Sequence, residues 1–116
     1  MKVPCVPSPA RRPQRTHRRL VRVVEALGIV RNLDIGFLDP QTAYDVGQRV
    51  NRPDADAVML ACGNWSTFDV IDRLERDLGK PVLTTNQVTL WHALKMMGTR
   101  PLDGLGVLLK RHLSAI

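Results

Sequence analysis

Two short apolar segments, each followed by a helical pattern, constrain the fold of this chain of 116 residues more than any other feature. Residues 57–61 (AVMLA) and 81–85 (PVLTT) have the length of strands, and short apolar runs of this kind are typical of a buried parallel sheet. Residues 68–78 and 87–97 follow them as predicted helices. Strands that alternate with helices indicate an α/β domain with a small parallel sheet flanked by helices.

Two further helices are expected before the first strand. Residues 16–27 have apolar side chains three and four positions apart, which is the spacing of one helical face. Asp39 followed by Pro40 is typical of an N-cap with proline in the first turn, and predicts a helix over residues 40–50. Between these helices, residues 29–30 have the character of a strand that stops early.

Hydroxyl and amide side chains are expected to cap the later helices. Ser66 or Thr67 can cap the helix after the first strand, and Thr85 or Asn86 the helix after the second. Residues 105–115 are predicted to form a last amphipathic helix. Two strands make a sheet too small to be covered on both faces, so either the region before the first strand adds strands at 29–30 and 33–38, or the chain belongs to a larger structure.

The net charge of +6 is confined to the first quarter of the chain. Residues 1–31 hold eight basic residues and one acid, a net charge of +7, whereas residues 32–116 have a net charge of −1. We expect residues 1–15 to form a basic, Pro/Arg-rich irregular leader and residues 16–116 to form the folded lobe. A solvated leader is the simpler interpretation, because no aromatic residue lies among the arginines to stack on bases. An arm that binds nucleic acid is the alternative.

The sequence contains no apolar run of the roughly 18 to 20 residues that cross a membrane, and its N-terminus lacks the apolar region of a secretory signal. The two cysteines, Cys5 and Cys62, have neither a CxxC partner nor zinc-ligand spacing, so no metal site is expected. We expect both thiols to be reduced and the protein to be cytoplasmic.

Cys62 directly follows the first predicted strand, and Gly63 and Asn64 come next. Ligands of open parallel sheets bind at the carboxyl ends of strands. The backbone N–H groups of residues 63–65 can point into one concavity that suits an anion, and a nearby helix start favours a thiolate. Such a thiol can exchange a proton with carbon or act as a nucleophile. The alternative is a small buried side chain that closes the strand.

Polar residues at the end of the second strand can complete such a site. Thr85 and Asn86 offer a hydroxyl and an amide to a carboxylate, and in a sheet of adjacent strands they would face Cys62. A helix cap is an equally good role for them. Tyr44, the only tyrosine, can reach towards the site from the preceding helix, whereas His92 is expected to pack or to lie on the surface.

Several motifs, in order, resemble the carboxyl-terminal half of the aspartate/glutamate racemase superfamily, in particular its branch of maleate cis-trans isomerases and arylmalonate decarboxylases. The motifs are LDPQ, the strand that ends in Cys-Gly-Asn, FDVI, GKPV, TNQ and LWHAL, and the resemblance covers about residues 29–110. It implies one lobe of a two-lobed, racemase-like α/β fold. It also implies an enzyme, either an isomerase of the cis-trans or racemase type or a decarboxylase, that uses neither a metal nor an organic cofactor.

The resemblance further implies roles for individual residues. Cys62 matches the catalytic cysteine of the second lobe, and Gly63 and Asn64 would contact the carboxylate of a small mono- or dicarboxylate substrate. In such enzymes the thiol exchanges a proton with a substrate carbon, adds to a double bond, or protonates the enediolate left by decarboxylation.

Members of this superfamily are roughly twice as long as this chain, as a two-lobed α/β enzyme requires. The chain therefore looks like a truncated member in which Cys5 is a poor substitute for the first-lobe cysteine, and we expect it to be inactive alone. Its expected partners are the carboxylate substrate and either a second copy of the chain or a separate first-lobe chain. No association with a membrane is expected. The alternative is a non-catalytic interaction module whose basic N-terminal arm binds nucleic acid.

Overall fold

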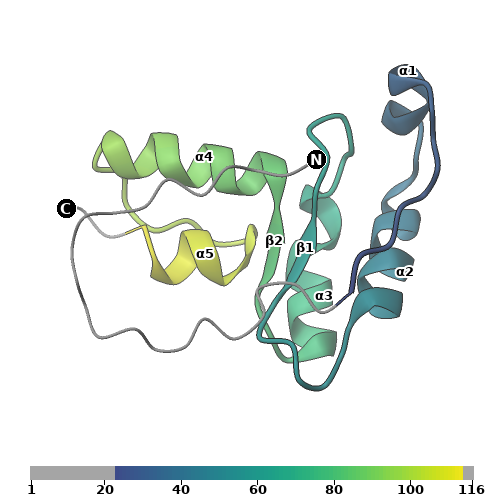
Figure 1. Ribbon diagram of the computed structural model, residues 1–116. Coiled ribbons are helices and arrows are strands. Elements are labelled where there is room, and N and C mark those ends of the chain that lie inside the picture. The colour runs from purple at the N-terminus through teal and green to yellow at the C-terminus, as the bar shows by residue number, and fades with distance from the viewer. Residues whose placement is uncertain (1–22, 114–116) are drawn as a thin grey trace, which may run out of the picture.

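The computed structural model describes residues 23–113, which form a two-stranded parallel sheet with helices packed around it (Figure 1). The elements in chain order are α1 (Asn32–Gly36), α2 (Pro40–Val50), β1 (Val58–Leu60), the 3₁₀ helix η1 (Phe68–Val70), α3 (Ile71–Leu78), β2 (Val82–Thr84), α4 (Thr85–Met96) and α5 (Gly106–Arg111). β1 and β2 run in parallel, with Met59 opposite Leu83. The predicted α/β class with a small parallel sheet is confirmed.

One face of the sheet carries the main core. Alternate side chains of a strand point to the same face, so Val58 and Leu60 of β1 lie on one side of the sheet. Both are almost fully buried there, as is Val82 of β2. Helices α2 and α3 pack against this face, where Leu74 of α3 is fully buried. The two helices approach closely at Gly47, since a Cβ atom there would lie 2.8 Å from a methyl carbon of Leu74.

The opposite face of the sheet is only partly covered by residues 23–113. Met59 is 56% exposed, and its neighbour Leu83 is half-buried. In the described part of the chain, β1 pairs with β2 alone, so the sheet has no third strand. Parallel sheets are normally covered on both faces. Here α4 and α5 contact β2 and Leu83 lines a pocket next to them, whereas Met59 on β1 stays exposed among the described residues.

Three N-terminal expectations are wrong. Residues 23–27 are not helical, and the rest of the helix expected at 16–27 lies outside the described residues. Residues 29–30 form no strand, and the region 33–38 overlaps α1 instead of adding a strand. The apolar pattern fails here because a helix of this length depends on packing of its apolar face, and Val24 is 82% exposed.

Local capping signals are partly confirmed. Asp39 caps α2 as predicted, because its Oδ1 accepts a hydrogen bond from the backbone N–H of Thr42 at 2.8 Å. The caps predicted for α4 are wrong, since Thr84 is the N-cap and forms a capping box with Gln87. Thr67 stands at the N-cap of η1, but its side chain makes no capping hydrogen bond. Within residues 23–113, no helix is both long and apolar enough to cross a bilayer.

Candidate active site

Cys62 lies just beyond the carboxyl end of β1, where the sequence predicts the site. It is a free cysteine and half-buried. Its side chain packs against the edge of the core and also lines a cleft of about 1030 Å³, which we call the Cys62 cleft. The cleft lies among β1, α2 and residues 23–29. Cys62 is therefore not sealed in the interior, which argues against the alternative of a purely structural cysteine.

A tight turn follows Cys62, and its hydrogen bonding shows that part of the predicted anion site is wrong. The backbone N–H of Trp65 donates to the carbonyl oxygen of Cys62 at 3.3 Å, so it cannot also point into an anion concavity. Gly63 and Asn64 at the centre of the turn are exposed, and neither has a positive φ. Residues 63–70 separate Cys62 from α3, so α3 does not supply a helix start next to the thiol.

The ends of the two strands meet, as the sequence predicts for adjacent strands. The side-chain N–H of Asn86 donates to the carbonyl oxygen of Gly63 at 3.0 Å. Asn86 and Thr85 are both half-buried in the first turn of α4, and neither is the helix cap. The hydroxyl of Thr85 makes no hydrogen bond within the described residues. The structure therefore brings Asn86 to the loop that follows Cys62, with Thr85 beside it in sequence.

Tyr44 is held at α3 and not at the Cys62 cleft. Its hydroxyl donates to Asp77 at 2.6 Å and accepts from Gln48 at 3.0 Å. The guanidinium of Arg73 lies 3.9 Å from the centre of the tyrosine ring. These contacts give Tyr44 a role in joining α2 to α3. The exposed His92 lies next to Trp91 on α4, so the expectation of a packing or surface role for it holds.

Trp65 lines the Cys62 cleft with its side chain, whereas the sequence predicts only a role for its backbone N–H. The indole of Trp65 is 6% exposed and lines the cleft, and its Nε1–H has no hydrogen-bond partner within residues 23–113. Buried donors are normally paired, so this N–H lacks a partner that a ligand or further chain could supply. The signal in the sequence was a tryptophan directly after Gly63 and Asn64 in a chain with few aromatic residues.

Residues 23–29 form one wall of the cleft and are tied to α2 by an ion pair between Glu25 and Arg49. The pKa of Glu25 is below its ordinary value, chiefly because Arg49 donates a hydrogen bond to its carboxylate. The same hydrogen bond raises the pKa of Arg49. Within the part of the chain that the structure describes, no group of three or more His, Cys, Asp or Glu side chains could hold a metal ion.

The fold and the site together define an α/β lobe with a cysteine at the end of a parallel strand. A family model for arylmalonate decarboxylase matches residues 15–109. The chain therefore belongs to the arylmalonate decarboxylase family.

Individual relatives agree with this assignment. The chain is 33% identical over 75 residues to an arylmalonate decarboxylase from Bordetella bronchiseptica, an alignment that covers 63% of this chain and 31% of the relative. It is 34% identical over 74 residues to a maleate isomerase from Alcaligenes faecalis, covering 63% and 29%. The crystal structure of an arylmalonate decarboxylase superimposes with a TM-score of 0.65 at 32% identity, over 72% of this chain and 39% of the other. The chain thus spans about a third of the length of the curated relatives it matches.

Proposed function

We propose that this chain supplies the cysteine-bearing lobe of an enzyme site for small mono- or dicarboxylates, with Cys62 as the catalytic thiol. The observation that carries the proposal is a half-buried cysteine at the carboxyl end of β1, lining a cleft, in a chain of this family. Open parallel sheets bind ligands at that end. In the proposal, Gly63, Asn64, Thr85 and Asn86 contact the substrate carboxylate.

The proposed reaction is a cofactor-independent decarboxylation or isomerisation, because the relatives are named arylmalonate decarboxylase and maleate isomerase. In a decarboxylation, carbon dioxide leaves its electron pair on the neighbouring carbon as an enediolate. The Cys62 thiol then protonates that carbon, and the thiolate regains a proton from water. In an isomerisation, the thiolate adds to one carbon of the double bond, the new single bond rotates, and the thiolate leaves again.

A second lobe or a second copy of the chain would complete this site. The exposed Met59 on one face of the sheet supports this part of the proposal, because parallel sheets are normally covered on both faces. Orientation of a substrate by groups on both sides can contribute about 7 kcal/mol or more to lowering a barrier. We therefore propose that residues 1–116 alone turn over substrate at a negligible rate.

The test combines two measurements on the full chain. The rate of alkylation of Cys62 by iodoacetamide is measured with and without phenylmalonate or maleate, and turnover of both compounds is assayed in parallel. We expect the dicarboxylate to slow alkylation of Cys62 but not of Cys5. The turnover assay is repeated after adding the separately produced first lobe of the Bordetella bronchiseptica relative, with Cys62→Ser as the test variant and Cys5→Ser as its matched control.

Turnover that appears with the added lobe and disappears in Cys62→Ser would support the proposal. Turnover that survives in Cys62→Ser would refute the role of the thiol. Fast, Cys62-dependent turnover by the chain alone would refute the requirement for a second lobe.

A further inference from the structure

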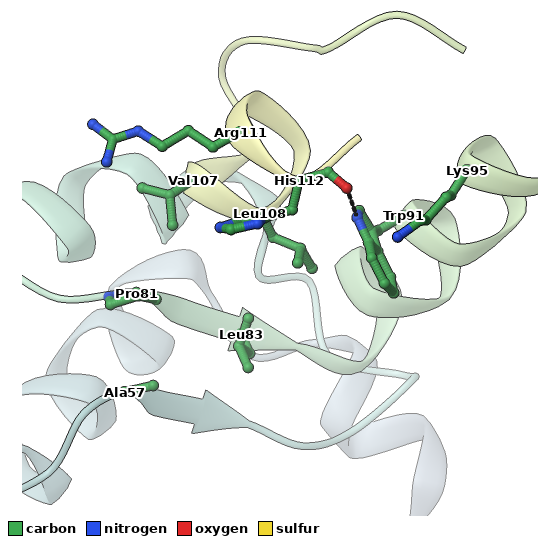
Figure 2. A pocket seen from close by; sticks show the side chains of 9 residues that line it. All are labelled: Ala57, Pro81, Leu83, Trp91, Lys95, Val107, Leu108, Arg111 and His112. Carbon is green, nitrogen blue, oxygen red and sulfur yellow. Dashed lines mark hydrogen bonds between the residues drawn. The ribbon is translucent and has the colours of Figure 1, made fainter. Parts of the chain in front are cut away.

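A second cavity, with a volume of about 490 Å³, lies between β2, α4 and α5 (Figure 2). Cys62 is not among its lining residues, and the cavity shares only Ala57 and Leu83 with the Cys62 cleft. Its volume is within the range of about 300 to 1,000 Å³ that is typical of small-molecule sites. We call it the Trp91 pocket.

Trp91 forms a fixed aromatic wall of this pocket. Its Nε1–H donates to the carbonyl oxygen of His112 at 2.9 Å, which holds the indole of α4 against the end of α5 (Figure 2). Leu83 of β2 and Leu108 of α5 are half-buried and add aliphatic surface to the lining. A fixed indole next to aliphatic side chains suits a flat apolar group.

The charged residues around the pocket are all basic. Lys95 lies over the Trp91 ring, with its Nζ 5.0 Å from the ring centre, and Arg111 extends from α5 on the other side of the pocket (Figure 2). In residues 23–113, the guanidinium of Arg111 has no hydrogen-bond or ion-pair partner, whereas the adjacent Lys110 pairs with Asp103 at 2.9 Å. Of the described residues, no acidic one lines the pocket. A bound anion would therefore be attracted by the basic residues and not repelled by a carboxylate.

We propose that the Trp91 pocket binds a small aromatic carboxylate. The ring lies against Trp91 and the leucine side chains, and the carboxylate pairs with Lys95 or Arg111. The apolar walls favour a hydrocarbon ring over a sugar or a bare phosphate, and the guanidinium fork matches the two oxygens of a carboxylate. This site is separate from Cys62 and does not depend on the function proposed for that thiol.

The test is a titration of the full chain with naphthoate, followed by NMR at the indole N–H resonances of both tryptophans. We expect a saturable shift at Trp91 and none at Trp65, which lines the Cys62 cleft. At least one of Lys95→Gln and Arg111→Gln should weaken binding about fivefold or more, because it removes the charged partner of the carboxylate. Arg76→Gln, which removes an exposed positive charge from α3 outside the pocket, should leave the affinity unchanged.

Naphthamide, which has the same ring without the charge, should bind more weakly by a similar factor. Equal affinity for naphthoate and naphthamide would overturn the proposal, because the basic residues would then have no role. An unchanged affinity in both Lys95→Gln and Arg111→Gln would overturn it as well. A shift at Trp65 that disappears in Cys62→Ser would assign the ligand to the Cys62 cleft and would also contradict the proposal.

Discussion

Gly106 is a residue at which α5 approaches α3 closely. Its φ is +83°, a conformation that residues with a side chain rarely adopt. Its N–H donates to Asp72 at 2.8 Å and the N–H of Val107 donates to Glu75 at 2.8 Å, so two carboxylates of α3 hold the start of α5. A Cβ at this position would lie 2.7 Å from a methyl carbon of Ile71. Position 106 therefore requires glycine, both because of its backbone conformation and because there is no room for a side chain.

Gly106→Ala should destabilise the protein more than Gly79→Ala. Gly79 also has a positive φ, of 67°, but nothing lies within 4 Å of its Cβ position, so alanine there incurs the backbone cost alone, about 1–2 kcal/mol. At Gly106 the same cost is joined by overpacking, about 1–3 kcal/mol more. Urea unfolding of the two variants measures the difference, and equal free energies of unfolding would contradict the close approach.

At the scale of elements, a prediction from the sequence is more reliable when its signal depends only on residues close together in the chain. Asp39 and Pro40 fixed the start of α2 because the capping bond spans three residues. The start of α4 was missed because Thr84 lies in an apolar run, although its spacing to Gln87 is that of a capping box. The conformation of residues 23–27 could not be predicted from periodicity, because it depends on the surface against which these residues pack in the folded protein.

The cap of α2 predicts a pH dependence of stability. The pKa of Asp39 is lowered from 3.8, first because the backbone N–H of Thr42 donates to its carboxylate and then because the Thr42 hydroxyl does. A lowered pKa in the folded state means that the charged cap stabilises the protein above about pH 4 and that this contribution is lost as the pH falls through the folded value. Asparagine is a cap of similar quality that does not titrate in this range.

The difference in stability between the wild type and Asp39→Asn should therefore change between pH 7 and pH 2.5, with the wild type losing more. Urea midpoints at both pH values measure it. Asp56→Asn, which removes an exposed carboxylate outside α2, is the control. Parallel pH profiles for the wild type and Asp39→Asn would contradict the assigned capping bond.

At the scale of the whole molecule, one face of the sheet is covered, and the other is exposed at Met59 among the described residues. The family and the position of Cys62 could be predicted from ordered motifs in the sequence, whereas the exposure of Met59 could not, because burial of that face depends on residues that face it in space. The nucleic-acid alternative stays a prediction about the leader, since residues 23–113 carry ten basic and eleven acidic residues.

The exposed sheet face at Met59 predicts association with a partner. If a second copy of the chain covers it, sedimentation velocity should show dimers whose fraction rises with concentration, and Met59→Lys should give monomers, because a buried unpaired charge is costly. The 56% exposure of Met59 in the single chain implies that Met59→Lys still folds. Thr89→Lys, at an exposed position on α4, is the control that should still associate. A wild type that sediments as a monomer at all concentrations would contradict homo-oligomerisation and leave a separate first-lobe chain as the partner.

The ion pair between Glu25 and Arg49 has a consequence for access to the thiol. The ion pair is exposed to solvent, so a higher salt concentration weakens it. Residues 23–29 then lose one of their attachments to α2 beside the cleft. Chemical modification of Cys62 should therefore become faster as ionic strength rises, and the rate in Glu25→Gln should be high and nearly independent of salt.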